Sequence, residues 1–191
     1  MDQIDFQIEQ IRKDANEITK GLLNRLSVAK ENLQRAVDNV TDSVSSLAKS
    51  IEVCSNAESR FATLCAGLEH LEQSKRGLDV CFSSFLGSDT MIAEAKMRLI
   101  GWEGDMTFYE MRSHDAAETV SKLQEFQQRV EAAEGQFIKD RLWAERIVCR
   151  LLPHFLEEVY RASDAERSGL GFRTKSVLTL CGAFCNEIKF S

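Results

Sequence analysis

The chain has 191 residues, a net charge of −6 and a single proline, Pro153. Hydrophobic residues make up 43% and charged residues 28%, which argues against disorder. No stretch is basic and no apolar run approaches the roughly 20 residues that span a bilayer, so we predict no nucleic-acid binding and no transmembrane helix. The acidic, amphipathic start lacks the features of a signal peptide, and we expect a cytoplasmic protein or a fragment of one.

The first part of the chain carries a long apolar stripe. From Ile4 to Leu71 apolar residues recur at steps of almost always three or four, which is typical of a coiled-coil helix and not of a strand. Leaving these residues in water would forgo roughly 1.5–3 kcal/mol for each of them, so either the rest of this chain or another chain must cover the stripe. We call it the N-terminal stripe and predict that these residues bind partner helices: Ile4, Ile8, Ile11, Ile18, Leu22, Leu26, Leu33, Val40, Val44, Leu47, Ile51, Phe61, Leu64, Leu68 and Leu71.

The N-terminal segment is either one helix or a hairpin. A continuous helix over residues 2–72 would be about 105 Å long. Neither glycine nor proline marks a turn in the serine-rich stretch 41–58, which favours a continuous or merely bent helix. The alternative is a hairpin with its turn near residues 53–56, where Ser55 and Glu58 have the spacing of a capping box.

A break is predicted at residues 86–89, where Gly87 suits a left-handed helix cap. A short helix over 90–100 should follow and end at the glycine-containing stretch 101–105. Its inward residues should be Met91, Ile92, Ala95 and Leu99.

The remaining sequence predicts further helices. A long helical pattern runs from Asp115 to Leu151, and Pro153 should kink it or start a new helix over 154–166. A loop at 168–171 then precedes a last helix over 174–190. We therefore predict an all-α protein with two parts, a long coiled-coil helix or hairpin (1–86) and a small helical bundle (87–191).

The sequence offers no set of residues for catalysis or for binding a cofactor. His70, His114 and His154 are isolated, and neither a P-loop nor a GxGxxG motif occurs. Cys181 and Cys185 share one helix face, but no further ligand at metal-binding spacing lies nearby, so a core position is favoured over a metal site. We therefore predict no enzyme activity, no cofactor, no metal and reduced cysteines.

Two stretches resemble a known family. They are ITKGLLNRLSVAKENLQRAVDNV (18–40) and LEHLEQSKRGLDVCFSSFLGSD (68–89). Together they resemble the N-terminal region of exocyst-type vesicle-tethering subunits. The resemblance implies a long coiled-coil helix for subunit assembly, followed by stacked helical bundles, and no enzyme activity.

These observations predict a non-enzymatic assembly or scaffold protein, which the resemblance places in a vesicle-tethering complex. It would bind other subunits through the N-terminal stripe, as a homo- or hetero-oligomer, and would reach a membrane only through its complex. The alternative is a self-contained bundle, with the stripe folded onto residues 115–160, that acts in signalling or perturbs membranes. An enzyme would need an inward polar cluster that the sequence does not show.

Overall fold

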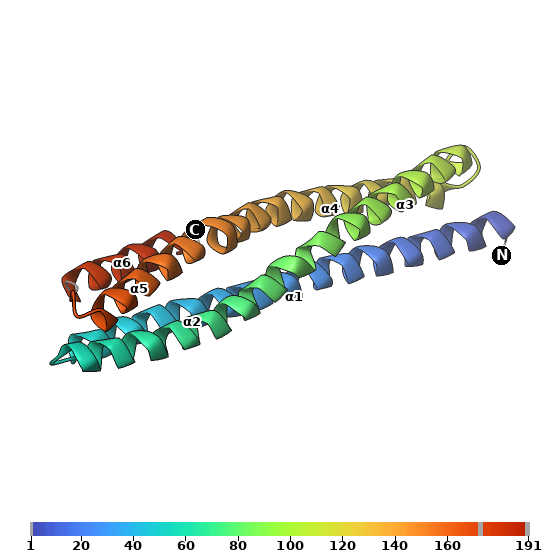
Figure 1. Ribbon diagram of the computed structural model, residues 1–191. Helices are drawn as coiled ribbons and strands as arrows, with labels where there is room; N and C mark the ends of the chain where they lie inside the picture. Colours follow the sequence, from blue (N-terminus) through green and yellow to red (C-terminus); the bar gives the residue numbers. More distant parts are fainter. Residues whose placement is uncertain (1, 172–173, 190–191) are drawn as a thin grey trace. The chain divides into compact units, whose positions relative to one another are not determined.

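The protein is all-α, as predicted from its sequence. A computed structural model describes residues 2–171 and 174–189, of which 92% are helical and none is in a strand. The helices are α1 (Gln3–Glu52), α2 (Ala57–Ser84), α3 (Ser88–Tyr109), α4 (His114–Arg146), α5 (Leu152–Arg167) and α6 (Thr174–Glu187) (Figure 1). A 3₁₀ turn (Phe85–Gly87) joins α2 to α3, and a π-helical segment (Ile147–Leu151) joins α4 to α5.

The N-terminal region is a hairpin and not the continuous helix that the lack of glycine and proline favoured. α1 ends at Glu52 and α2 begins at Ala57, so the turn lies at residues 53–56, where the alternative placed it. Asn56 caps α2, because its side-chain oxygen accepts a hydrogen bond of 2.8 Å from the backbone N–H of Ser59. The cap is therefore Asn56 and not Ser55, and the turn needs no glycine.

Two predicted breaks differ in the structure. The break predicted at residues 86–89 is the 3₁₀ turn between α2 and α3, one residue earlier than predicted. Gly87 has φ −81°, so it lies in a right-handed turn and does not form a left-handed cap. The helix predicted to end at residue 100 continues through Gly101 and Gly104 to Tyr109. The helix is held on its inner side by Leu99 and Met106, which are both fully buried. Packing of that side offsets the roughly 1 kcal/mol that each interior glycine costs a helix.

The predictions for the C-terminal part largely hold. The π-helical segment comes directly before Pro153 and widens the turn in which the proline ring would meet a carbonyl of the preceding turn. The predicted loop at 168–171 contains two glycines in the left-handed region, Gly169 (φ 71°) and Gly171 (φ 63°). α6 ends at Glu187, and residue 190, the predicted end of the last helix, lies outside the described residues.

The chain forms two compact units, each built from segments far apart in the sequence. Unit 1 comprises Met1–Lys30 and Ser84–Arg141, and unit 2 comprises Glu31–Ser83 and Leu142–Ser191. These units cut across the predicted parts 1–86 and 87–191, because helices on both sides of residue 86 contribute to each core.

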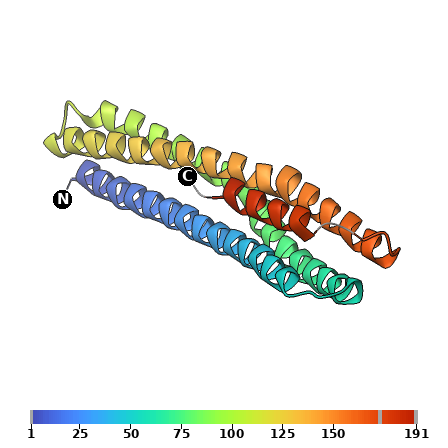
Figure 2. The ribbon, with the colours of Figure 1, turned by 90° about the vertical axis from the view of Figure 1, so that its left-hand side faces the viewer.

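Unit 1 is a three-helix arrangement of the first part of α1 with α3 and α4. α3 and α4 run side by side in opposite directions in both views (Figure 1, Figure 2). Phe85 and Phe137 meet edge to face with ring centroids 5.2 Å apart. The core is completed by the buried residues Ile8, Ala15, Leu22, Ile92, Ala95, Leu99, Met106, Ala116, Leu123 and Val130.

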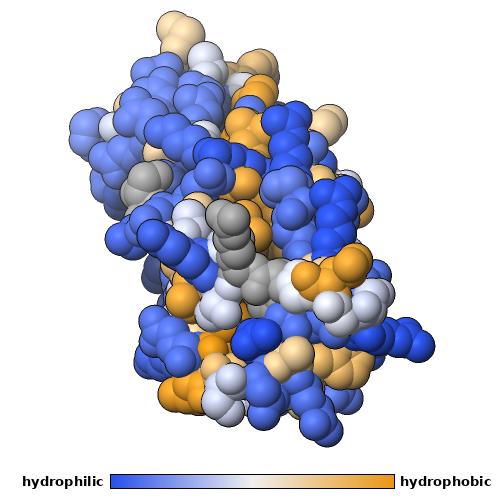
Figure 3. All heavy atoms as spheres, turned by 60° about the vertical axis from the view of Figure 1, so that its left-hand side comes forward, coloured by the Kyte–Doolittle hydropathy of each residue, from blue (hydrophilic) through white to orange (hydrophobic). Residues whose placement is uncertain are grey.

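Unit 2 combines the second part of α1 with α2, α5 and α6. Ser43 of α1 contacts Ser74 of α2 (2.9 Å), and the rings of Phe155 (α5) and Phe184 (α6) lie 4.9 Å apart. The unit is therefore a bundle of helices around an apolar core. Hydrophilic side chains dominate the molecular face in Figure 3, with hydrophobic residues showing between them.

Candidate functional site

The structure places the N-terminal stripe in the interior of the two units. Ten of its fifteen residues are buried, and none is exposed. The five that are half-buried are Ile4, Ile11, Ile18, Leu26 and Phe61. The cover that the stripe requires is therefore supplied largely by this chain, and the five half-buried residues keep only part of their surface exposed.

Close helix contacts show how the stripe is covered. In unit 1, the half-buried Arg12 of α1 donates a hydrogen bond of 3.0 Å to Thr119 of α4. In unit 2, a Cβ atom built on Gly67 of α2 would lie 2.5 Å from Cδ1 of Leu47. Gly67 therefore permits a close approach of α1 and α2 on which the burial of Leu47 depends.

A buried ion pair joins α2 to α5 in unit 2. Nε of Arg60 (α2) lies 2.7 Å from a carboxylate oxygen of Glu166 (α5), and the Glu166 side chain is fully buried. A charge-assisted hydrogen bond of this length fixes α2 against α5. Because its geometry pairs a helix with a helix and reaches no cavity, we assign it a structural role.

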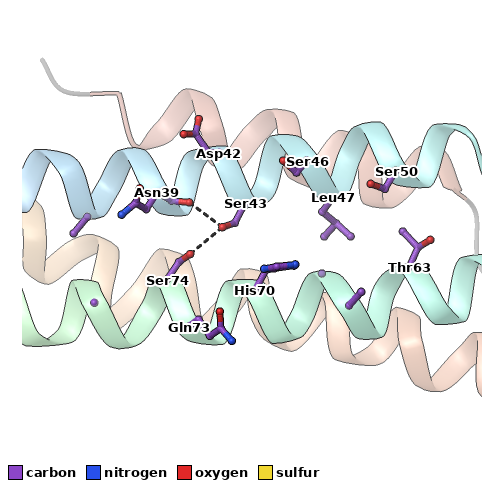
Figure 4. Close-up of a pocket in the computed structure, with 14 residues that line it drawn as sticks. Asn39, Asp42, Ser43, Ser46, Leu47, Ser50, Thr63, His70, Gln73 and Ser74 are labelled. Carbon is purple, nitrogen blue, oxygen red and sulfur yellow. Dashed lines mark hydrogen bonds between the residues drawn. The ribbon is translucent and has the colours of Figure 1, made fainter.

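A groove between α1 and α2 in unit 2 has a volume of about 690 Å³. Its lining is mostly small and polar (Figure 4). The labelled lining residues are Asn39, Asp42, Ser43, Ser46, Leu47, Ser50, Thr63, His70, Gln73 and Ser74.

The groove does not hold an activated nucleophile. Ser43 donates its hydroxyl proton to the carbonyl of Asn39 at 2.8 Å, so Ser74 is the donor in the Ser43–Ser74 contact of 2.9 Å (Figure 4). A serine that acts as a nucleophile would instead donate to a general base. This relay of hydroxyl groups satisfies polar atoms on the α1–α2 seam and gives no basis for catalysis.

Of the cysteine pair of α6, Cys181 belongs to the core and Cys185 is half-buried. Cys181 is buried, and burial raises the pKa of its thiol to about 11. A metal ligand must be a thiolate, which this environment opposes. Among the described residues no group of three or more His, Cys, Asp or Glu side chains is placed to hold a metal ion.

An apolar surface that the sequence analysis missed lies on the outer side of α3, in unit 1. Eight positions define it, and we call them the α3 outer stripe: Leu86, Thr90, Ala93, Met97, Ile100, Gly104, Thr107 and Met111. Six of them lie in α3, Leu86 lies in the 3₁₀ turn before it, and Met111 lies in the turn after it. All eight are exposed, Met97 at 74% and Met111 at 97% of their possible area. Phe108, which is 71% exposed, lies beside the stripe. α3 is therefore apolar on its inner side and on its outer side.

Charged residues along one flank of the α3 outer stripe are directed toward α4. Arg141 contacts Asp89 at 2.5 Å, and Lys96 contacts Glu134 at 2.7 Å. The hydrogen bond and the charge of Glu134 raise the pKa of Lys96. Long side chains held in this way do not fold over the stripe, so its apolar atoms stay open to solvent.

Glu103 is held to α4 in the same manner. It accepts hydrogen bonds from Gln124 (3.0 Å) and Gln127 (2.7 Å), and these bonds lower its pKa. Glu103 is therefore a carboxylate at neutral pH, fixed on the flank of the stripe.

No known protein family, no curated protein and no solved structure matches this chain. The described helices also include none with the length and apolar character that crossing a bilayer requires. The function of the protein is therefore inferred from its own surface.

Sequence reasoning missed the α3 outer stripe because it ended the helix at Gly101. The alternating steps of four and three from Leu86 to Met111 were present in the sequence. The three glycines in the interval, Gly87, Gly101 and Gly104, hid this spacing. The inward residues Ile92, Ala95 and Leu99, which were predicted correctly, account for only one side of the helix.

Proposed function

We propose that this protein is a non-enzymatic helical assembly module that binds a partner protein through the α3 outer stripe. The observation that carries the proposal is the apolar character of α3 on both sides. A helix side that is lined with apolar residues is normally buried. The charged residues of α3, among them the exposed Glu94, Arg98 and Asp105, lie between its two apolar sides. In this chain only the inner side is buried, so the outer side has the properties of an interface.

The free energy that burial of these apolar side chains would contribute supports binding. Burying each of Leu86, Met97, Ile100, Phe108 and Met111 would contribute roughly 1.5–3 kcal/mol, which amounts to the order of 10 kcal/mol for the set. Contiguous apolar patches of this kind on a soluble domain mark interaction sites. The proposal replaces the N-terminal stripe as the binding surface, since that stripe fills the interior of the units.

The narrower form of the proposal is a subunit of a cytoplasmic vesicle-tethering complex. It is supported by the resemblance of residues 18–40 and 68–89 to exocyst-type subunits, which assemble through helices and have no enzyme activity. In that setting the protein would meet membranes only through its complex.

The competing proposal is a self-contained bundle that signals or perturbs membranes. The observation in its favour is that the chain covers its own N-terminal stripe. For a membrane-perturbing bundle, the α3 outer stripe would insert into lipid instead of binding protein. An acidic chain without a basic face has little attraction for anionic lipid, which favours a protein partner.

The test compares the wild-type chain with a variant that carries Met97→Asp and Ile100→Asp. Val80→Asp is the matched control, because Val80 is an equally exposed apolar residue (71%) in unit 2. Protein binding lost only in the double variant, with helicity unchanged, supports the proposal. Equal binding by all three chains, or dye release from liposomes by the wild type and not by the double variant, would contradict it.

A further inference from the structure

We infer that the α3 outer stripe binds the same stripe of a second copy of this chain, antiparallel and around a twofold axis. This inference rests on the proposed function and names its partner. An isologous contact requires one surface to be complementary to itself. The sequence of the α3 outer stripe has that property.

The spacing of the stripe is the first observation. From Leu86 to Met111 the steps alternate between four and three residues and read the same from either end. The alternating steps of four and three divide the stripe residues into two alternating sets. In an antiparallel helix pair, a residue of one set faces a residue of the other set in the partner helix. A copy turned end for end therefore places every stripe residue opposite another stripe residue, with none left over.

The residues that then face each other are matched in size and polarity. Within α3, Met97 lies opposite Ile100 of the second copy, while Leu86 and Met111, in the turns that flank α3, meet at the ends of the seam. Thr90 lies opposite Thr107, whose hydroxyl donates to the carbonyl of Glu103 and so leaves its methyl group for the interface. Ala93 lies opposite Gly104, which lets the two backbones approach closely.

Phe108 fits the same register. It lies beside the stripe, and the antiparallel copy brings Gly87 to the position opposite it. The exposed surface of Gly87 has no neighbouring atom within 4 Å of a Cβ position, so it leaves room for a ring. A phenylalanine ring placed over Gly87 would bury a large apolar area at the rim of the seam.

The charges on the flank are compatible with this pairing at its centre. Lys96 and Glu103 of the two copies face each other on the same flank, and the twofold axis repeats this attractive pair. Asp89 and Glu110 also face each other, at the outer ends. Asp89 is bound by Arg141, Lys96 by Glu134 and Glu103 by two glutamines, and exposed charges are screened by water and salt, so the flank charges contribute little of either sign and do not oppose the pairing.

The area is sufficient for a dimer. The four large apolar side chains of the stripe together with Phe108 bury roughly 60–120 Å² each, or about 300–600 Å² of apolar surface per copy. A standard interface buries about 800 Å² per partner, of which about 60% is apolar. The expected dimer is at the lower end of stable interfaces, so its formation should depend on concentration in the micromolar range.

The experiment is disulfide trapping in the full chain with Cys65→Ser and Cys149→Ser, which remove the two exposed thiols. One preparation carries Ala93→Cys and the other carries Gly104→Cys. We expect a cross-linked dimer when the two are mixed and oxidised, and little when Ala93→Cys is oxidised alone. The double variant Met97→Asp, Ile100→Asp should raise the dimer dissociation constant, measured by light scattering, at least a hundredfold. This corresponds to a factor of about ten for each of the two copies in the dimer. Val80→Asp should leave it unchanged.

The outcomes separate this inference from the proposed function. Cross-linking of Ala93→Cys with itself would mean a parallel pair and would overturn the antiparallel register. A chain that stays monomeric at high micromolar concentration would overturn the second-copy inference altogether. If that monomer still loses binding to another protein through Met97→Asp and Ile100→Asp, the proposed function stands with a different partner. If it binds vesicles of neutral phospholipid instead, both fail.

Discussion

At the scale of single residues, the two glycines of α2 that line the α1–α2 groove have different surroundings. A Cβ at Gly67 would press on Leu47, which is buried, whereas a Cβ at Gly77 meets nothing within 4 Å. Gly77→Ala should therefore stabilise the protein by about 0.5–1 kcal/mol, the helix-propensity gain of alanine. Gly67→Ala has the same gain but adds an overpacking cost of about 1–3 kcal/mol and should be less stable than Gly77→Ala. Urea unfolding of the pair measures the difference, and equal stabilities would contradict the close approach of α1 and α2.

The cysteines provide a second test at this scale. Burial raises the pKa of Cys181 to about 11, so its thiol stays protonated until the pH approaches that value. At pH 8 only about one Cys181 in a thousand would be the reactive thiolate, against roughly a quarter for an ordinary thiol. Cys65 and Cys149 are exposed and should react with iodoacetamide at least 100 times faster than Cys181. Mass spectrometry of a labelling time course measures this ratio, and comparable rates would show that Cys181 of α6 is not buried in the core.

At the scale of elements, the helices and their inward sides follow from the sequence, while their ends do not. Steps of three and four residues predict both α1 and α4, because those steps reflect one buried side of a helix. The turn after Glu52 was placed only as an alternative, since a single Asn56 cap supplies what a glycine or proline usually supplies. The end at Gly101 was predicted wrongly, because burial of Leu99 and Met106 outweighs the low helix propensity of glycine.

The continuity of α3 can be tested at Gly101. This glycine is exposed in the middle of the helix, with no atom within 4 Å of a Cβ position. Gly101→Ala should therefore raise the free energy of unfolding by about 0.5–1 kcal/mol. A break in the helix with a left-handed glycine would instead make the alanine variant less stable. Thermal unfolding followed by circular dichroism distinguishes the two results.

At the scale of the whole molecule, the sequence showed that the N-terminal stripe had to be covered but not by what. Periodicity reports that one side of a helix is buried, and a partner chain produces the same pattern as the chain's own helices. The α3 outer stripe, which carries the proposed function, was recognisable only after exposure separated it from the inner side of the same helix.

Substitutions in the N-terminal stripe test whether its residues lie in the interior of the protein or at an interface with another chain. Leu26→Asp, Leu33→Asp and Val40→Asp together place three carboxylates in positions that the units bury or half-bury. If these residues formed an assembly interface, the triple variant would be a folded monomer. Because the stripe is interior, we expect the triple variant to lose most of its helicity, each change costing several kcal/mol. A soluble, helical monomer would contradict the interior placement.

The central claim is that the chain covers its own N-terminal stripe, and dilution tests it most directly. Helicity by circular dichroism and mass by light scattering would be measured on the same samples across the concentration at which any dimer dissociates. We predict that helicity stays constant while the mass falls to that of one chain, 21.6 kDa. If helicity fell over the same concentration range as the mass, the N-terminal stripe would need a second chain to cover it. That result would contradict the central claim.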